Sequence, residues 1–234
     1  MNYFWKSFGL FVTWISFVCV AWGQPVYIDH RDQDKGVVTV CVSPSGIFRE
    51  LPGSQNRSLG MILFGEEVTH QGQEALVKGE NRNYILVKTQ SGQIGWMDDR
   101  ELVKDAGVVV LTEDSRLFQR PGNYAAAVGQ FFYAGEIAIL SDYKDNWVKL
   151  IGRGKNKVGW IQGYENLSVE PLDLEIAKLY ADALDIADPD QRVLALQNIG
   201  DTPNFNSSPL AGVIKDAVLV ASPTEGAGVS PRKL

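Results

Sequence analysis

The chain has 234 residues, of which 45% are hydrophobic and 21% are charged. This composition is ordinary for globular protein, and the length allows either one large domain or two small ones with extensions. The formal net charge is −6. Because nucleic acids are polyanions, an acidic chain is not expected to take nucleic acid as its main partner.

The first 23 residues have the features of a secretory signal. Lys6 is their only charged residue, an apolar run covers residues 8–22, and Ala21 and Gly23 are small residues where a signal peptidase reads the chain. The sequence therefore predicts a signal peptide over residues 1–23 and a mature protein that is exported, either periplasmic or extracellular. The alternative is an uncleaved anchor, which would be the only contact with a membrane, but the apolar run is short for a span.

Residues 24–36 are polar and are expected to form a linker. The β-branched residues 37–42 that follow predict a strand, with Cys41 as a buried member of it. Cys41 is the only cysteine outside the signal segment, so neither an intramolecular disulfide nor a multi-cysteine metal site is possible. No metal and no cofactor is predicted for this chain.

Short strands separated by turn residues are predicted for most of the chain up to residue 168. Residues 84–88 and 93–97 flank a turn at Ser91-Gly92, and residues 146–151 and 157–161 flank a second turn that contains glycine. Apolar residues alternate with outward lysines in both pairs of segments, which is typical of β-hairpins. The sequence therefore predicts a mainly β protein.

Two stretches of the chain contain the same motifs in the same order. These are Pro52-Gly53, Gly65-Glu66 and Gly95-Trp96 in the first stretch, and Pro121-Gly122, Gly135-Glu136 and Gly159-Trp160 in the second. The displacements are 69, 70 and 64 positions. A constant order with drifting spacing is typical of a duplicated β fold, because loops tolerate insertions and strands do not. We predict two tandem small barrels, over residues 37–104 and 107–168.

The pairs Gly95-Trp96 and Gly159-Trp160 are interpreted as structural motifs of the two barrels. A tryptophan at the start of a strand can cover one end of a small barrel and bury about 150–250 Å². The preceding glycine removes a Cβ that would obstruct the ring or the bend. Trp96 and Trp160 are therefore predicted to belong mainly to the barrel cores.

Helical patterns replace the strand patterns after Pro171. Apolar residues recur at helical spacing over residues 172–187, and Asp188 followed by Pro189 matches the N-cap and first position of a second helix that ends at Gly200. We predict a helical hairpin over residues 171–200. Residues 201–234 are rich in Asn, Ser, Pro and Gly and are expected to be mostly disordered, with room for one helix at residues 210–220.

Several motifs of the second stretch occur together in a known family. They are the turn Arg120-Pro121-Gly122, Gly135-Glu136-Ile137, residues 146–150 and Val158-Gly159-Trp160-Ile161. Over about residues 107–168 the chain resembles the bacterial SH3 domain (SH3b, or SH3 type 3). The first stretch fits at residues 51–53, 65–68 and 94–97, but has no tryptophan in residues 84–88, where the family pattern expects one.

The resemblance implies that each of the two modules is a five-stranded SH3-like barrel. With the helical pattern after Pro171, the predicted fold is mainly β, with two tandem SH3-like small barrels followed by a short C-terminal α-helical region. The resemblance also implies an exported bacterial protein whose modules bind cell-wall peptide or glycan, or tether a partner domain. It does not imply catalysis, since a fold does not define a function.

No catalytic residue is predicted. The exported enzymes that most often carry such modules use a Cys-His pair, for which this chain offers Cys41 with His30 or His70. These residues lie in or before the first barrel, and no nucleophile motif precedes a helix. The protein is therefore predicted not to be an enzyme.

Binding is predicted to use aromatic side chains, since a groove lined with aromatic rings suits sugar rings, proline or aliphatic peptide. The candidate ligand-binding residues are Phe131, Tyr133, Tyr143 and Trp147 in the second barrel and Phe64 and Tyr84 in the first. Core packing is the alternative for each of them.

The expected partner is peptidoglycan or an extracytoplasmic peptide or protein. Two other functions stay open. One is a scaffold that docks a protein partner through the C-terminal helices, and the other is a regulatory or targeting subunit of a cell-wall hydrolase.

Overall fold

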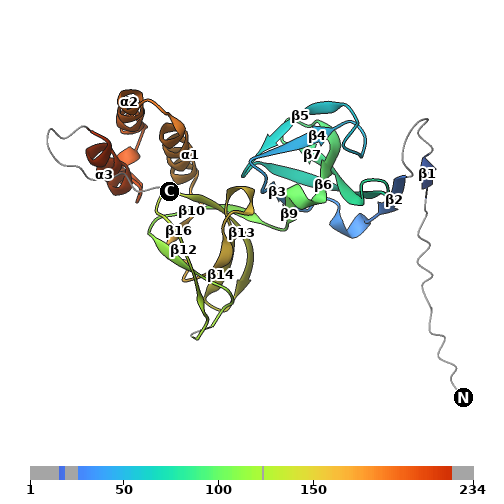
Figure 1. Cartoon of the computed structure of the whole chain (residues 1–234), viewed down its shortest axis with the longest axis horizontal. Coiled ribbons are helices and arrows are strands. Elements are labelled where there is room, and N and C mark those ends of the chain that lie inside the picture. Colours follow the sequence, from blue (N-terminus) through green and yellow to red (C-terminus); the bar gives the residue numbers. More distant parts are fainter. Residues whose placement is uncertain (1–15, 19–25, 123, 223–234) are drawn as a thin grey trace, which may run out of the picture. The chain divides into compact units, whose positions relative to one another are not determined.

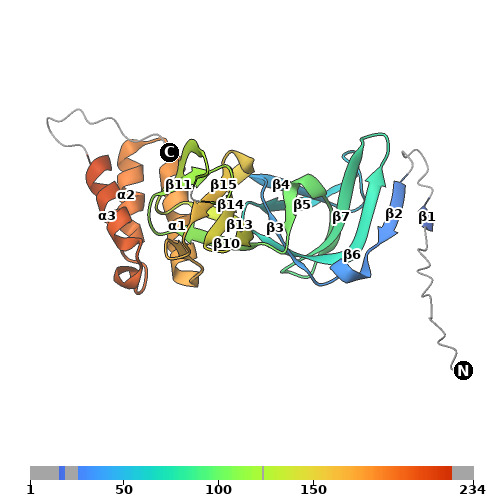
Figure 2. The same cartoon turned by 90° about the horizontal axis from the view of Figure 1, so that it is seen from below.

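The computed structural model describes residues 16–18, 26–122 and 124–222. Two antiparallel sheets precede three short α-helices (Figure 1 and Figure 2). The predicted fold class, mainly β with a short helical C-terminal region, is confirmed. The described residues form two compact units: the first contains those up to Thr39, Gly46–Ile62 and Glu67–Leu102, and the second contains Val40–Ser45, Leu63–Glu66 and those from Val103 onward.

The first sheet has nine strands. They are β1 (Ser16–Val18), β2 (Val26–His30), β3 (Val38–Cys41), β4 (Ser45–Arg49), β5 (Ser58–Leu63), β6 (Glu67–Val77), β7 (Arg82–Thr89), β8 (Ile94–Asp98) and β9 (Leu102–Lys104). β7 pairs with β8, as the predicted hairpin requires, and its other edge pairs with β6.

The second sheet has seven strands. They are β10 (Gly107–Leu111), β11 (Ser115–Phe118), β12 (Ala127–Phe132), β13 (Ile137–Lys144), β14 (Trp147–Ile151), β15 (Val158–Gln162) and β16 (Leu167–Ser168). Their order is β12-β11-β15-β14-β13-β10-β16, and strands of the first sheet repeat it as β5-β4-β8-β7-β6-β3-β9. The duplication in the sequence therefore corresponds to a repeated topology.

The two Gly-Trp pairs occupy equivalent places in the two sheets. Trp96 on β8 lies opposite Arg49 on β4. Trp160 on β15 lies opposite Phe118 on β11. Arg49 and Phe118 are 69 positions apart, which is the displacement of the two Pro-Gly turns, so the same pairing occurs in both copies.

The glycine before each tryptophan is required by the close approach of a neighbouring strand. A Cβ on Gly95 would lie 2.5 Å from the carbonyl oxygen of Arg49, and a Cβ on Gly159 would lie 3.0 Å from that of Phe118. Any larger residue would push β4 or β11 away. Glycine is therefore required at both positions, as predicted, but the atoms that exclude a Cβ belong to the neighbouring strand and not to the tryptophan ring.

The second unit also contains two short segments from the first half of the chain. Its central core consists of Val109, Leu111, Leu117, Phe132, Ala138, Val148, Leu150 and Ile161. A further cluster consists of Val40, Val42, Ile139 and Ile151, with Phe64 packed against it. The units are therefore not divided by a single break between residues 104 and 107, where the motifs place it.

Residues 26–30 are not part of a linker, and this corrects the prediction for residues 24–36. They form β2, which pairs with β6 from Val26 opposite Val77 to His30 opposite Gln73. Valine, tyrosine and isoleucine favour strands, but the polar residues after them obscured this signal. β1 pairs with β2. Residues 1–15 and 19–25 lie outside the described residues, so the signal peptide stays a prediction.

The predicted helical hairpin is present as α1 (Pro171–Asp185) and α2 (Pro189–Ile199). Asp188 caps α2 as the sequence indicates, because its carboxylate accepts the N–H of Gln191 at 2.8 Å. Pro189 takes the first helical position, where its missing N–H costs no hydrogen bond.

Residues 201–222 are ordered, which corrects the prediction that the tail is mostly disordered, whereas the helix expected at residues 210–220 is present. They form η4 (Phe205–Ser207) and α3 (Ala211–Ala221). The buried cluster that joins the helices to β10 consists of Val110, Ile176, Ala177, Ala183, Leu196, Ile199, Phe205, Leu210, Ala211 and Ile214. The apolar residues of this segment are Phe205 and most of residues 210–221, and they complete the cluster together with those of α1 and α2. Residues 223–234 lie outside the described residues.

Asp173 on α1 links the helices to the second sheet. Its side chain is buried, and its carboxylate accepts hydrogen bonds of 2.5 Å from the hydroxyls of Ser168 on β16 and Ser208 before α3. A buried carboxylate is stable only with such partners. These two bonds therefore join three parts of the second unit.

Asp173→Ala is expected to lower the free energy of unfolding by about 3 kcal/mol, because hydrogen bonds to a charged group contribute about 1.5–3 kcal/mol each. Chemical denaturation of the full chain measures the loss. Asp182→Ala removes an exposed carboxylate from the same helix and is the control. Equal stability of the two variants would contradict the role of Asp173.

Candidate functional site

One side of the second sheet carries aromatic and cationic side chains. Residues directly opposite each other in neighbouring strands point to the same side of a sheet. The sets of opposite residues on this side are Phe118, Trp160 and Lys149; Arg116 and Phe131; and Trp147 and Gln162. The alternate residues Leu117, Val148 and Ile161 are in the core, so this set points away from it. We call the set the aromatic face.

The rings of the aromatic face differ in how far they are covered. Phe118 and Trp147 pack edge to face, with ring centroids 5.3 Å apart and an interplanar angle of 87°. This packing leaves Trp147 only 7% exposed, whereas Phe131 is 38% exposed and Trp160 is half-buried. Trp147 is therefore mostly covered by its neighbours, whereas Phe118, Phe131 and Trp160 expose part of their rings to a ligand.

A pocket of about 150 Å³ opens beside Phe118. Its lining residues are Asp114, Ser115, Arg116, Phe118, Ile161, Gln162 and Asn166. Guanidinium and amide groups donate hydrogen bonds, the carboxylate accepts them, and the phenyl ring supplies an apolar wall. Such a mixture suits a polar group on an apolar frame, such as a peptide or N-acyl amide.

Three of the predicted ligand-binding residues are brought together here. Phe131 and Trp147 belong to the aromatic face, and the ring of Tyr133 stacks on that of Phe131 with centroids 6.4 Å apart. The ammonium group of Lys157 lies 5.0 Å from the centroid of the Tyr133 ring and forms an ion pair of 2.6 Å with Glu136. Tyr133 is therefore held at the end of the face by a cation–π contact.

The other three predicted residues lie elsewhere. Tyr143 is 73% exposed, but it lies opposite Val148 and so points to the core side of the sheet. Phe64 packs in the core of the second unit. Tyr84 is buried, with 2% exposed. Phe64 and Tyr84 thus take the core role that was their alternative.

Phe118, Trp160 and Arg116 were not predicted as site residues. Trp160 was assigned mainly to the core, on the same motif as Trp96. The signal that could have placed Phe118 and Arg116 is their alternation with Leu117, which puts both on the side opposite the core. Their contact with Trp160 and Phe131, however, depends on strand register.

Tyr84 holds in the first sheet the place that Trp147 holds in the second. The opposite pairs are Tyr84 with Asp98 and Leu86 with Trp96 on β7 and β8, and Trp147 with Gln162 and Lys149 with Trp160 on β14 and β15. Each aromatic residue is thus two positions before the partner of the motif tryptophan. The tryptophan absent from the first stretch is replaced by this tyrosine.

Strand β2 covers the equivalent face of the first sheet. Val26 and Ile28 pack in one cluster with Tyr84 and Trp96, and Trp96 is 6% exposed. In the second sheet Trp160 is half-buried, and the described residues include no strand in the place of β2. Of the two copies, the second therefore presents the open aromatic face.

A hydrogen-bonded network fixes Tyr84 in the first unit. Its hydroxyl donates to the carboxylate of Glu80 at 2.6 Å, and the N–H and hydroxyl of Ser54 donate to the same carboxylate at 2.7 and 2.9 Å. Burial, together with the bond to Glu80, raises the pKa of Tyr84 to about 12. Burial alone would raise the pKa of Glu80, but the hydrogen bonds from Tyr84 and Ser54 outweigh it and lower that pKa below its ordinary value.

The lowered pKa of Glu80 predicts a pH dependence of stability. A carboxyl group whose pKa is lower in the folded state stabilises that state above its unfolded pKa, and this contribution is lost as the pH falls through the folded pKa. Glu80→Gln is therefore expected to cost about 2 kcal/mol at pH 7 and progressively less in acid. Denaturation curves between pH 7 and pH 3 measure this. Glu67→Gln, at an exposed position, is the control, and a constant Glu80→Gln loss at every pH would disprove the assignment.

Within the described residues, one group of side chains has the composition of a metal site. Asp34, His70 and Glu74 have ligand atoms within 4.8 Å of one another. Nδ1 of His70 accepts the N–H of Gly72 at 2.8 Å, so we assign the proton of the neutral ring to Nε2, which lies 3.7 Å from Glu74. A protonated nitrogen does not bind a metal, and we assign no metal here.

The candidate nucleophile Cys41 is completely buried, as predicted. Its Sγ lies 3.6 Å from the carbonyl oxygen of Ser43. His70 is also buried, and His30 is exposed at the end of β2. None of the three contributes to the aromatic face.

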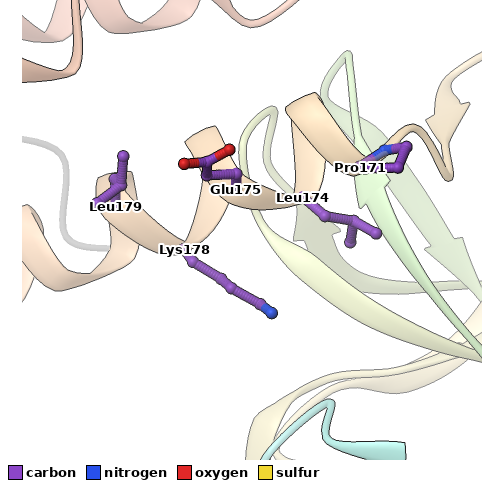
Figure 3. Close-up of a pocket in the computed structure, with 5 residues that line it drawn as sticks. All are labelled: Pro171, Leu174, Glu175, Lys178 and Leu179. Carbon is purple, nitrogen blue, oxygen red and sulfur yellow. The ribbon is translucent and has the colours of Figure 1, made fainter. Parts of the chain in front are cut away.

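A second hollow, of about 430 Å³, lies along α1. Pro171, Leu174, Glu175, Lys178 and Leu179 line it, and all five belong to this helix (Figure 3). Pro171, Leu174 and Leu179 supply its apolar part, and Glu175 and Lys178 supply its charged groups. No helix within residues 26–122 and 124–222 is long and apolar enough to span a membrane.

No family model matches this chain, and comparison with curated proteins gives no match. NlpC2 from Trichomonas vaginalis matches with 13% identity and a TM-score of 0.26, over 70% of this chain and 56% of that protein. NlpC1 from the same organism matches with 14% identity and a TM-score of 0.26, over 58% and 47%. A Listeria monocytogenes protein described as an autolysin matches with 13% identity and a TM-score of 0.25, over 56% and 62%. The chain spans about half the length of these proteins, and TM-scores this low do not define a common fold.

Proposed function

We propose that the chain is an exported, non-enzymatic binding protein whose tandem SH3b modules recognise cell-wall material or an extracytoplasmic peptide. The observation that carries this proposal is the aromatic face of the second sheet, where Phe118, Phe131 and Trp160 present ring surface. Aromatic rings offer a large apolar surface with little conformational freedom to lose, which suits sugar rings and aliphatic side chains alike.

The charges on the aromatic face favour a ligand with carboxylate groups. Arg116 and Lys149 flank the central rings, and of the residues of β13 on the same side Lys144 lies opposite Trp147 and Asp142 opposite Lys149. Three cationic groups thus face one carboxylate among these opposite residues, in a chain whose formal net charge is −6. A local positive surface on an acidic protein attracts anionic groups selectively, and guanidinium binds carboxylate in a bidentate geometry. Peptides of the cell wall carry such carboxylates.

The burial of the nucleophile supports binding over catalysis. A thiol acts as a nucleophile when it is accessible and has a nearby base. Cys41 is completely buried beside a backbone carbonyl, and Nδ1 of His70 accepts a backbone N–H. A binding role needs neither group.

The proposal is tested by retention of the mature protein, residues 24–234, on purified peptidoglycan. Retention that weakens with added salt is expected, because Arg116 and Lys149 contribute to the contact. No retention at any salt concentration would overturn the cell-wall form of the proposal.

The hollow on α1 favours a second candidate function, docking of a protein partner by the helices. Leu174 and Leu179 line it, and Leu194 on α2 and Leu219 on α3 are also exposed. Leu179→Glu in the full chain would abolish complex formation but leave peptidoglycan retention unchanged if the helices dock a partner. A targeting subunit of a cell-wall hydrolase would lose the complex with Leu179→Glu and wall retention with Trp160→Ala.

A further inference from the structure

Strand β2 is an extended segment that pairs with the edge of β6 in the first sheet. The second sheet has no described strand at the equivalent place. β2 pairs antiparallel with β6, with Ile28 opposite Ala75 and His30 opposite Gln73. Its alternate side chains Val26 and Ile28 pack on the cluster that contains Tyr84 and Trp96. The first unit thus holds part of its own chain by backbone pairing and by alternate aliphatic side chains.

The corresponding edge of β13 in the second unit is open. Glu74 of β6 lies opposite Ile85 of β7, and Tyr143 of β13 lies opposite Val148 of β14. Because Ile85 and Val148 are equivalent residues of the two sheets, Tyr143 corresponds to Glu74, which pairs with β2. Within the described residues, β10 pairs with β13 from Ile137 to Leu140, and no strand pairs with that edge further along.

The three residues of this open edge are exposed. They are Asp142, Tyr143 and Lys144. The backbone N–H of Tyr143 donates to the carboxylate of Asp142 at 2.8 Å. A side chain that satisfies an edge N–H can be displaced by an incoming strand, whose carbonyl accepts the same hydrogen bond.

We infer that the second unit binds an extended peptide, which adds as a strand to Asp142–Lys144 of β13 and lays alternate aliphatic side chains on the aromatic face. The inference rests on the proposed function and names its ligand class. Strand addition takes affinity from main-chain hydrogen bonds and selectivity from alternate side chains. Because β13 ends at Lys144 whereas β6 extends to Val77, fewer backbone bonds form than for β2, and the rings carry more of the contact.

The segment on the first unit supplies the probe for the test. A synthetic peptide of residues 25–31 is titrated into the isotopically labelled mature chain, and amide and indole signals are followed by NMR. Shifts at Asp142–Lys144 and at the indoles of Trp147 and Trp160 are expected. Shifts confined to Gln73–Val77 would mean that the peptide only displaces β2, and would overturn the inference.

Methylated peptides distinguish strand addition from simple apolar contact. Successive N–H groups of a strand point to opposite edges, so one neighbour uses only alternate ones. Ile28 and Asp29 lie opposite Ala75 and Glu74, which correspond to Lys144 and Tyr143. N-methylation at one of these two peptide residues is expected to weaken binding at least tenfold, and methylation at the other is expected to have little effect. Equal effects at both residues would overturn the inference. This test uses the protein without any substitution.

A protein variant tests the same edge from the other side. Tyr143→Pro removes the edge N–H, and Tyr143→Ala keeps it while removing the ring. If the proline variant loses peptide binding and the alanine variant keeps it, the result supports strand addition, provided that the NMR spectrum shows the proline variant to be folded. If the proline variant is unfolded, the methylated peptides decide the question.

The same measurements separate this inference from the proposed function. Retention on peptidoglycan with no response to the peptide would overturn the inference and leave the proposed function standing. Peptide binding at β13 without peptidoglycan retention would support the inference and exclude the cell-wall ligand. Response of the aromatic face to glycan fragments but not to the peptide would overturn the inference.

Discussion

Gly95→Ala is expected to lower the stability of the first unit by about 3 kcal/mol, at the upper end of what overpacking costs. The added methyl group would lie 2.5 Å from the carbonyl oxygen of Arg49 and 2.8 Å from the ring of Phe48. Because the nearest atom belongs to the backbone, the strain is relieved only if β4 moves away from β8. Hydrogen exchange of the β4 and β8 amides measures the local loss, and urea denaturation measures the total.

Two other glycines provide the matched comparison. Gly107→Ala is the control, because a Cβ there meets nothing within 4 Å, and it is expected to leave stability nearly unchanged. Gly159→Ala is expected to have an intermediate effect confined to the second unit, since its nearest contacts are at 3.0 Å. If Gly95→Ala were as stable as Gly107→Ala, the close crossing of β4 and β8 would be wrong.

Trp160→Ala is expected to weaken ligand binding by about thirtyfold, which corresponds to about 2 kcal/mol for a central aromatic contact. Trp160 lies between Phe118 and Lys149 on the aromatic face, so its removal separates the rings from the cationic side chain. Retention on peptidoglycan and the peptide titration both measure the effect. The fold is expected to survive, because this ring is half-buried on the outward side.

An exposed apolar residue of the same unit serves as the control for Trp160→Ala. Leu219 on α3 is 71% exposed and takes no part in the aromatic face, so Leu219→Ala is expected to bind normally. Thermal melting checks that both variants fold. Normal binding by a folded Trp160→Ala protein would rule out the aromatic face as the ligand site.

The repeated topology could be predicted from the sequence because its signals are local. The hairpin of β14 and β15 follows from alternation around a glycine-containing turn, and the start of α2 follows from Asp188 and Pro189. Gly95 and Gly159 mark the close strand approach in each copy. Each of these signals involves a few neighbouring residues, and no tertiary contact is needed to interpret it.

The difference between the two copies could not be predicted in this way. Trp96 and Trp160 follow the same glycine in the same motif, yet one is buried and the other half-buried. The difference arises from β2, which is far from Trp96 in sequence and packs on it through Val26 and Ile28. The same Gly-Trp motif therefore lies in two different environments, and the difference depends on the pairing of strands that are distant in sequence.

The residues of the aromatic face could be assigned only with knowledge of the strand register, in addition to the sequence pattern. Phe131 was visible as an aromatic residue, but its position opposite Arg116 follows an irregularity between β11 and β12. Tyr143 looked equivalent to Phe131 as a candidate, but one extra residue in β13 between Leu140 and Asp142 places it on the other side of the sheet. A shift of one residue reverses the side of every residue beyond it.

The contribution of Val40–Ser45 and Leu63–Glu66 to the second unit has a consequence for how this protein is synthesised and cut. A ribosome releases these two segments well before β10–β16, so the second unit can complete its core only after waiting for the later strands. Expression of residues 107–234 alone would leave Ile139 and Ile151 without Val40, Val42 and Phe64, and we expect that fragment to aggregate. A useful shorter protein has to be made by trimming the ends of the chain.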